Sequence, residues 1–156
     1  MPNYKQLLDI SNATLVAMGK SMINMGLNIP LVWNECANVF ENSAKNMLKD
    51  AGMIIEGNDV QSITENFASK VKELGFCQRA NILELNSDKI VMDLGECIFA
   101  SATKVFRGND REFIPPCPFM SMLYSTITER TGKVGYIESC QWKPEENTSV
   151  FTVKLN

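Results

Sequence analysis

The segment Phe76–Cys97, FCQRANILELNSDKIVMDLGEC, marks the point where apolar residues change from a helical to a strand-like spacing. Residues 76–85 are typical of one strand, and Asn86-Ser-Asp88 is typical of a turn. The returning strand begins with Ile90-Val-Met-Asp-Leu94, in which apolar residues occupy every second position. We therefore predict a β-hairpin here and a sheet in the half of the chain that follows.

The alternation in the second strand decides where Glu96 points. Side chains alternate across a strand, so Ile90, Met92 and Leu94 share one face, and a regular strand would place Glu96 on that face too. A carboxylate there needs a cation, a hydrogen-bond network or a metal. If the strand ends or bulges at Gly95, Glu96 points to water instead. The sequence leaves both alternatives open.

The remainder of the C-terminal half predicts a helix and a second hairpin. The motif Pro115-Pro-Cys-Pro118 favours a helix start, and the helix is expected to cover about residues 118–130. Cys117 lies at or beside its N-cap, where the helix dipole and free N–H groups lower the pKa of a thiol. Residues 133–142 and 149–155 have the composition of two strands joined by a turn.

The N-terminal half reads as helices, because its apolar residues recur at helical spacing. The expected helices cover residues 3–10, 11–26, about 31–50 and 60–74. A chain of 156 residues is expected to be a single domain, 1–156. We predict an α+β fold, in which a helical half (about 1–75) packs on the antiparallel sheet of a sheet-rich half (about 76–156). One helix lies between the two hairpins of the C-terminal half.

Charge and hydropathy exclude some partners. The net charge of −3 gives no reason to expect nucleic acid as a partner. No apolar run is long enough to cross a membrane, so we expect no membrane insertion. The N-terminal residues lack the basic and then apolar pattern of a signal peptide, and we predict a cytoplasmic protein.

The titratable residues restrict the chemistry. The chain has no histidine, which excludes catalysis by Ser-His-Asp or Cys-His groups and metal sites built on histidine. Its five cysteines are odd in number and irregularly spaced, unlike a secreted disulfide framework. In a reducing compartment they are buried apolar residues, metal ligands or reactive thiols.

Four segments of the C-terminal half carry a resemblance to a known family. They are Leu74-Gly-Phe-Cys-Gln78, Glu96-Cys-Ile-Phe-Ala100, Cys117-Pro-Phe-Met-Ser121 and Val134-Gly-Tyr-Ile-Glu-Ser-Cys140. In this order they resemble the 4-vinyl reductase domain, a hydrocarbon-binding domain found alone in archaea and as the sensory part of bacterial phenol-responsive regulators. It is more distantly similar to TRAPP vesicle-tethering subunits and haem-type nitric-oxide-binding domains. The resemblance covers about residues 70–156.

The resemblance implies a zinc site in which one of the four ligands is missing. Family members that bind zinc use a Glu and three Cys, of which Glu96, Cys117 and Cys140 match the first three. Thr148 or Ser149 stands where the fourth ligand, a cysteine, is expected. Structural zinc sites close with four protein ligands, so this site is either vestigial or open to water, to Cys97 or to a ligand. Cys97 faces away from Glu96 unless Gly95 marks a bulge.

The resemblance also implies an apolar pocket between helices and sheet, and dimerisation through the N-terminal helices. The leading hypothesis is therefore a sensor or carrier domain that binds a small apolar or aromatic ligand without catalysis. The candidate lining residues, each of which could instead be ordinary core, are Met18, Met22, Phe40, Phe67, Phe119 and Met120.

Two other functions remain as alternatives. One is an enzyme that acts on a tetrapyrrole or another hydrophobic substrate through a metal or a thiol. The chain has no glycine motif for a nucleotide reductant, and no catalytic residue can be assigned. The other is an interaction module that forms a homodimer, with Gly19 and Gly26 allowing close approach of helices.

Overall fold

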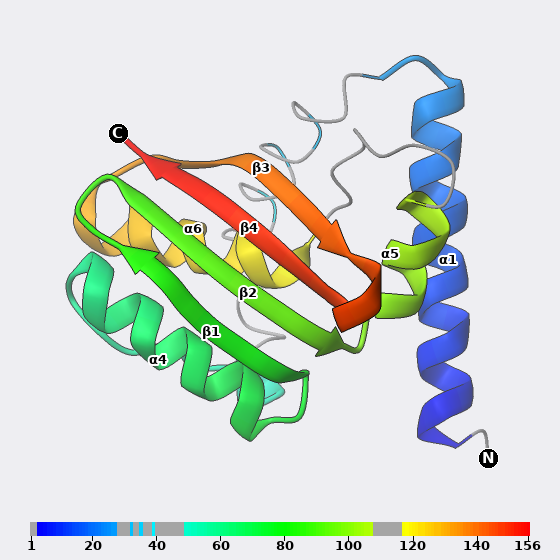
Figure 1. Cartoon of the computed structure of the whole chain (residues 1–156), viewed down its shortest axis with the longest axis horizontal. Helices are drawn as coiled ribbons and strands as arrows, with labels where there is room; N and C mark the ends of the chain where they lie inside the picture. Colours follow the sequence, from blue (N-terminus) through cyan, green and yellow to red (C-terminus); the bar gives the residue numbers. More distant parts are fainter. Residues whose placement is uncertain (1–2, 28–31, 33–34, 36–38, 40–48, 108–116) are drawn as a thin grey trace.

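The computed structural model describes residues 3–27, 32, 35, 39, 49–107 and 117–156 (Figure 1). Its helices are α1 (Tyr4–Asn24), α4 (Val60–Glu73), α5 (Ala100–Arg107), α6 (Pro118–Thr131) and the 3-10 turn η2 (Pro144–Glu146). Its strands are β1 (Cys77–Leu85), β2 (Lys89–Cys97), β3 (Gly135–Lys143) and β4 (Thr148–Leu155). Among these described residues, no helix is both long and apolar enough to cross a membrane.

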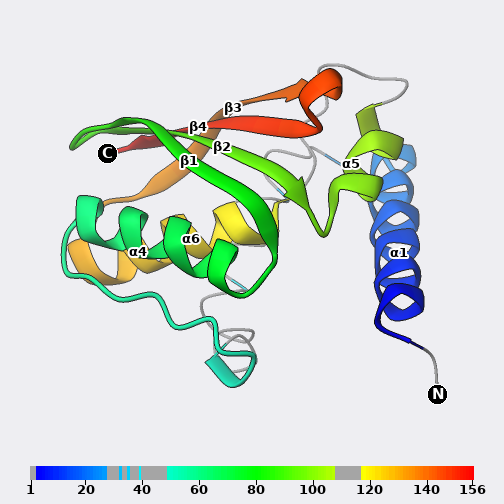
Figure 2. The same cartoon turned by 60° about the horizontal axis from the view of Figure 1, so that its bottom comes forward.

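The four strands form one antiparallel sheet in the order β1-β2-β4-β3. Two hairpins, β1–β2 and β3–β4, meet through the central pair β2–β4, in which Met92 lies opposite Phe151. Helices α4 and α6 cover the same face of the sheet (Figure 2). The predicted α+β class is confirmed, and two helices, α5 and α6, lie between the two hairpins, where the sequence predicted one.

Pairing within the first hairpin changes by one residue along its length. Near the turn, Glu84 lies opposite Val91, whereas beyond it Ile82 lies opposite Met92, so the pairing skips Leu83. Such a bulge inserts one unpaired residue into a single strand. Leu83 is exposed, whereas Ile82 before it and Leu85 after it both pack against the core beneath the sheet.

Helix α4 begins and ends where its local sequence signals predict. Asp59 is the N-cap, its side chain accepts a hydrogen bond from the Ser62 N–H, and the Ser62 side chain bonds back to complete a capping box. Gly75 follows the helix with a φ of +73°, which a glycine adopts without strain. The stripe that faces the sheet is fully or nearly fully buried and includes Ile63, Phe67 and Val71.

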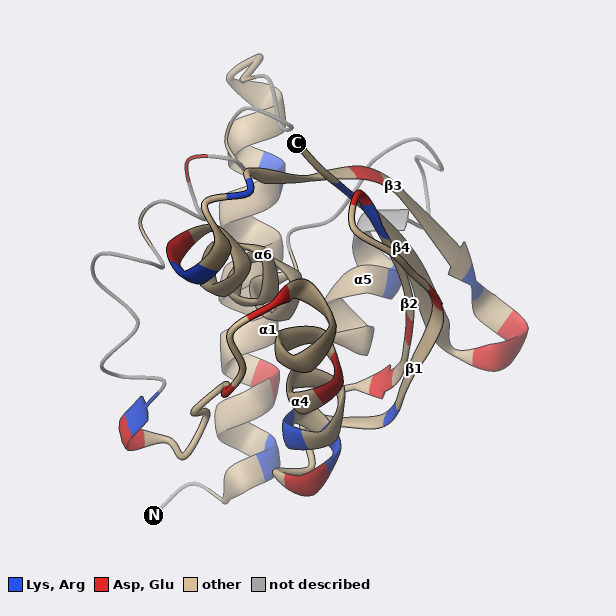
Figure 3. Cartoon of the chain, turned by 90° about the vertical axis from the view of Figure 1, so that its left-hand side faces the viewer, with Lys and Arg blue, Asp and Glu red and all other residues tan. Residues whose placement is uncertain are grey.

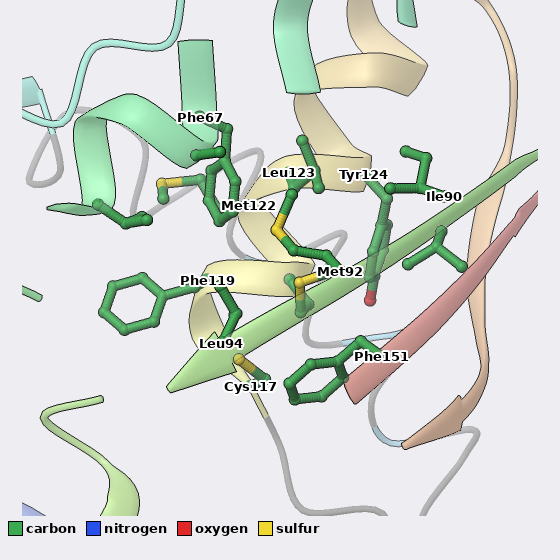
Figure 4. Close-up of a cluster of buried hydrophobic side chains, with 14 of the residues drawn as sticks. Phe67, Ile90, Met92, Leu94, Cys117, Phe119, Met122, Leu123, Tyr124 and Phe151 are labelled. Carbon is green, nitrogen blue, oxygen red and sulfur yellow. The ribbon is translucent and has the colours of Figure 1, made fainter. Parts of the chain in front are cut away.

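Helix α6 fills the middle of the core (Figure 4). Pro118 occupies the first turn, and Gly132 ends the helix in the left-handed conformation. Met120, Leu123 and Ile127 are all 0% exposed. Most of the buried apolar residues that the structure describes therefore lie where α4 and α6 meet the sheet.

Helix α1 differs from the prediction in two respects. It is one continuous helix, Tyr4–Asn24, instead of separate helices over 3–10 and 11–26. It also packs on α5 instead of on the face of the sheet, so that α4 is the helix that covers the sheet among the described residues of the N-terminal half. The contact joins Leu15, Val16 and Met22 of α1 to Ala102 of α5.

Helix α5 was not predicted from the sequence. It follows Ile98 and Phe99 directly after β2, and its link to α1 includes a hydrogen bond from the Asn12 side-chain amide to the Ile98 carbonyl (3.0 Å). The helix expected over about 31–50 lies for the most part outside the described residues. Charged residues of both signs are interspersed along α1, α4 and α6 (Figure 3).

Candidate functional site: a cysteine-lined cavity at the end of the core

A cavity of about 20 Å³ lies where the end of β2, the beginning of α6 and the β3–β4 connection come together. This volume is enough for about one water molecule. Its walls are mainly apolar and aromatic. The lining residues are Leu94, Cys97, Phe99, Ala100, Thr103, Cys117, Trp142, Asn147, Ser149 and Phe151. Figure 4 shows Cys117 at the start of α6, beside Leu94 and Phe151.

The backbone at Glu96 turns Cys97 toward this cavity. Glu96 has a φ of +49°, a left-handed conformation that is unusual for a residue with a side chain. Its N–H donates to the Asn147 carbonyl (3.0 Å), and its side chain is exposed. Of the two alternatives left open by the sequence, the structure shows the one in which Glu96 faces water. Cys97 is half-buried and packs against the hydrophobic core.

Cys97 is paired with a second cysteine, Cys77. The two residues are direct partners across β1 and β2. A hydrogen bond from the Cys77 thiol lowers the pKa of Cys97, and the Phe99 N–H, 3.4 Å from the Cys97 Sγ, lowers it further. The same bond, together with burial, raises the pKa of Cys77 far above its ordinary value. Cys97 is therefore the member of the pair that is more easily ionised.

Cys117 does not have the reactive character that its position predicted. It is the N-cap of α6, but its side chain makes no capping hydrogen bond and is 9% exposed. Burial raises the pKa of the Cys117 thiol, and the nearby Cys97 and Cys140 raise it further. The backbone N–H groups of Met120 and Phe119 lower it by less. The predicted lowering of the Cys117 pKa is wrong, because burial outweighs the helix N-terminus.

The three predicted zinc ligands do not share one environment. Cys117 and Cys140 are buried, whereas Glu96 is exposed. Within the parts of the chain that the structure describes, no three cysteine or carboxylate side chains gather closely enough to hold a metal ion. The exposed Glu96 does not fit a ligand set with the two buried thiols. Zinc binding by this set stays a prediction.

The positions expected for the missing fourth ligand carry hydroxyl groups with other contacts. Thr148 is fully buried, and its hydroxyl donates to the carboxylate of Asp93. Arg79 lies beside the same carboxylate, with its Nε 3.5 Å from an Asp93 oxygen. Ser149 lines the cavity. Thr148 therefore belongs to a buried polar group that stabilises the centre of the sheet.

Asn147 supplies a polar group at the edge of the cavity. It adopts the left-handed conformation that ends η2, and it is one of the lining residues. Its Oδ1 is buried, and no hydrogen-bond partner for it exists among the described residues. A buried acceptor without a partner is costly, and a bound molecule with a donor group would relieve that cost.

The five predicted ligand-lining residues that the structure describes lie outside this cavity. Phe67, Phe119 and Met120 are buried core residues, and Met22 packs near α5. Met18 is 55% exposed on α1. Phe40 lies outside the described residues.

Sequence reasoning missed the aromatic residues that do line the cavity. Phe99 and Trp142 each lie within or next to a segment that carries the family resemblance. Phe119 lies behind this wall, with its ring centroid 5.5 Å from that of Phe99. The signal that points to them is the motif segments themselves, since Phe99 lies within the Glu96–Ala100 segment and Trp142 follows Cys140 by two residues.

Comparisons with known proteins leave the family open. No protein-family model matches the chain, and no curated protein gives a significant match. The resemblance of the C-terminal half to 4-vinyl reductase domains therefore stays a prediction.

Proposed function

We propose that this protein is a small-molecule-binding domain of the 4-vinyl reductase type, a sensor or carrier for an apolar or aromatic ligand. The observation that carries the proposal is the cavity wall, in which Phe99, Trp142 and Phe151 combine with the buried Asn147 Oδ1, for which no described residue is a hydrogen-bond partner. Ligand sites typically join apolar and aromatic walls to a few polar groups that fix orientation. The preferred ligand carries a ring or chain and one hydrogen-bond donor.

Binding requires the cavity to expand. Ligand pockets typically measure ~300 Å³ or more, whereas this cavity is about 20 Å³. One wall is formed by Phe99, Ala100 and Thr103, at the beginning of α5. The opposite wall belongs to the sheet and to α6. Because α5 packs on α1 and not on the sheet face, its displacement is the opening that disturbs the core least.

Trp142 provides a direct test of ligand binding. The chain has two tryptophans, Trp33 and Trp142, so a Trp33→Phe variant leaves only the cavity tryptophan as a fluorophore. We expect at least one phenolic, terpenoid or acyl compound to change its emission and to raise the melting temperature. If no compound of the three classes changes either quantity, the proposal is overturned.

A pair of alanine substitutions locates the ligand. Phe99→Ala removes a cavity ring and is expected to weaken binding at least about tenfold, which corresponds to ~1.4 kcal/mol. Leu83→Ala, at an exposed residue on the sheet edge, is the control and should leave affinity unchanged. Equal affinities of the two variants would place the ligand elsewhere.

We also propose that the protein forms a homodimer through α1. Among the exposed apolar residues of α1 and its C-cap, Tyr4, Leu7, Met18 and Met25 are 68%, 51%, 55% and 68% exposed. With Ser11, Thr14 and Ser21 between them, they follow the alternating spacing of three and four residues that is typical of a helix–helix seam. The small residues in the seam favour a second copy of the same helix as the partner.

Light scattering tests the dimer. The double variant Leu7→Asp, Met18→Asp places charges in the seam and is expected to shift the mass from dimer to monomer. Ala13→Asp adds a charge at an exposed residue of the same helix outside the seam and should leave the mass unchanged. A wild-type monomer at high concentration contradicts the dimer but not the ligand site.

A further inference from the structure

Cys77 of β1 lies directly opposite Cys97 of β2, in the kind of antiparallel pair whose Cα atoms are closer together. The neighbouring pair is joined by a hydrogen bond from the Ile98 N–H to the Phe76 carbonyl (2.9 Å). Hydrogen-bonded and non-hydrogen-bonded pairs alternate along an antiparallel ladder, so Cys77 and Cys97 form a non-hydrogen-bonded pair. The Cα atoms of such a pair are ~4.5 Å apart, at the short end of the range that a disulfide spans, about 4.4–6.8 Å.

The two side chains also point to the same side of the sheet. Cys77 is buried in the hydrophobic core cluster and Cys97 packs against the same cluster. Each thiol also shifts the pKa of the other, as expected for two groups in close proximity. Both are free thiols in this structure. A bond between the sulfur atoms therefore needs a rotation of side chains and no rearrangement of the strands.

Access to the two sulfur atoms is unequal. Cys97 is half-buried and lines the cavity, whereas Cys77 is 1% exposed and is not one of the lining residues. A small reagent that enters the cavity meets Cys97 first. Cys77 is then placed to attack the modified sulfur, because it is the direct strand partner of Cys97.

We propose that Cys97 is a peroxide-modified residue and that Cys77 resolves it into a reversible cross-strand disulfide. Cys97 takes one oxygen from hydrogen peroxide to give a sulfenic acid, and one water is released. The Cys77 sulfur attacks the Cys97 sulfur, the S–O bond breaks, and the hydroxyl leaves as a second water with the proton of Cys77. In total, two thiols are oxidised and one peroxide is reduced to two waters.

The disulfide would change the wall of the cavity. Cys97 would turn from Phe99, whose N–H now bonds to its sulfur, toward Cys77. Phe99 leads directly into α5, so oxidation would alter the same wall that moves for a ligand. The inference does not rest on the proposed function, since the two cysteines are adjacent whether or not a ligand binds.

Peptide mapping tests the pairing directly, because each of the five cysteines lies in a separate tryptic peptide. Cys77 lies in peptide 73–79, Cys97 in 90–104, and Cys117 in 112–130. The folded protein is treated with hydrogen peroxide, remaining thiols are alkylated under denaturing conditions, and the digest is analysed by mass spectrometry. We expect a linked 73–79 and 90–104 pair that disappears after reduction.

Two variants give a second readout. Cys77→Ser removes the resolving thiol, so Cys97 should accumulate as a sulfenic acid that dimedone labels. Cys140→Ser is the matched control, because Cys140 is buried on β3, and it should keep the linked pair. Mapping of the wild type decides the question even if Cys77→Ser does not fold.

Three results would overturn the proposal. The first is a linkage of Cys97 to Cys117, which also lines the cavity. The second is an alkylated, unmodified Cys77 in protein whose Cys97 has been oxidised to a sulfinic acid. The third is a disulfide between two chains, seen as a dimer on a non-reducing gel.

Discussion

Helices α1 and α4 begin with the same kind of capping motif, but they differ in how much of their apolar surface is buried. Each starts with a capping box, Asn3 with Gln6 in α1 and Asp59 with Ser62 in α4. The apolar stripe of α4 is buried against the sheet and α6, whereas most apolar residues of α1 are exposed and only a narrow strip meets α5. Local signals thus determine where a helix forms, and the tertiary contacts determine what it stabilises.

The largest expected difference between the two helices is in the free energy of unfolding. Phe67 in α4 is 0% exposed, so Phe67→Ala leaves a cavity in the core and should cost ~3–5 kcal/mol. Ile23→Ala in α1, at a residue that is 44% exposed and lies outside the proposed dimer seam, should cost about 1 kcal/mol at most. Urea unfolding followed by circular dichroism measures both. Similar losses would mean that α1 belongs to the same packed core.

A smaller effect is expected at the attachment of α1 to the rest of the domain. Asn12→Ala removes the hydrogen bond to the Ile98 carbonyl, and about 1–2 kcal/mol of stability should be lost locally. Amide hydrogen exchange should then become faster in α1 while α4 keeps its protection. Faster exchange in both helices would show that they unfold as one unit, and the comparison would fail.

The smallest effect concerns the two helix caps and their dependence on pH. Hydrogen bonds from the Ser62 backbone and side chain lower the pKa of Asp59 below its ordinary value of 3.8. The ionised cap therefore stabilises the fold above pH 3.8, and this contribution is lost as the pH falls through the lower folded value.

Asp59→Asn removes this titration, so its melting temperature should approach that of the wild type as the pH falls below 3.8. Asn3, the corresponding cap of α1, carries no charge and supplies no such dependence. A melting-temperature difference that stays constant down to acidic pH would contradict the assignment.

The elements that could be predicted are those with local signals. Gly75 and Gly132 end α4 and α6, and alternation of apolar residues marks both hairpins. Short helix α5 was missed because it follows directly on a strand and has no capping signal of its own. The division of α1 into two helices was also wrong, because no glycine or proline separates residues 10 and 11.

The site was harder to predict than the fold. The Glu96 side chain points to water because Glu96 itself adopts a left-handed conformation. The alternation of apolar residues in the sequence could equally place this side chain on the core face. The lowered pKa predicted for Cys117 depended on its place at a helix start, but its burial depends on packing by distant segments. The pairing of Cys77 with Cys97 could not be read from the sequence, because it depends on the register of the hairpin.

The unpaired Leu83 shifts the pairing of β1 with β2 by one residue, and this shift decides which side chains of β1 face the core. A regular ladder continued from Glu84 and Val91 would place Gln78, not Cys77, opposite Cys97. It would also turn the inward residues of β1, such as Ala80 and Ile82, toward the other face of the sheet. Loss of this single residue from the chain would straighten the strand and leave every other partner unchanged. The length of β1 can therefore change at this one position while the other residue pairs between β1 and β2 stay the same.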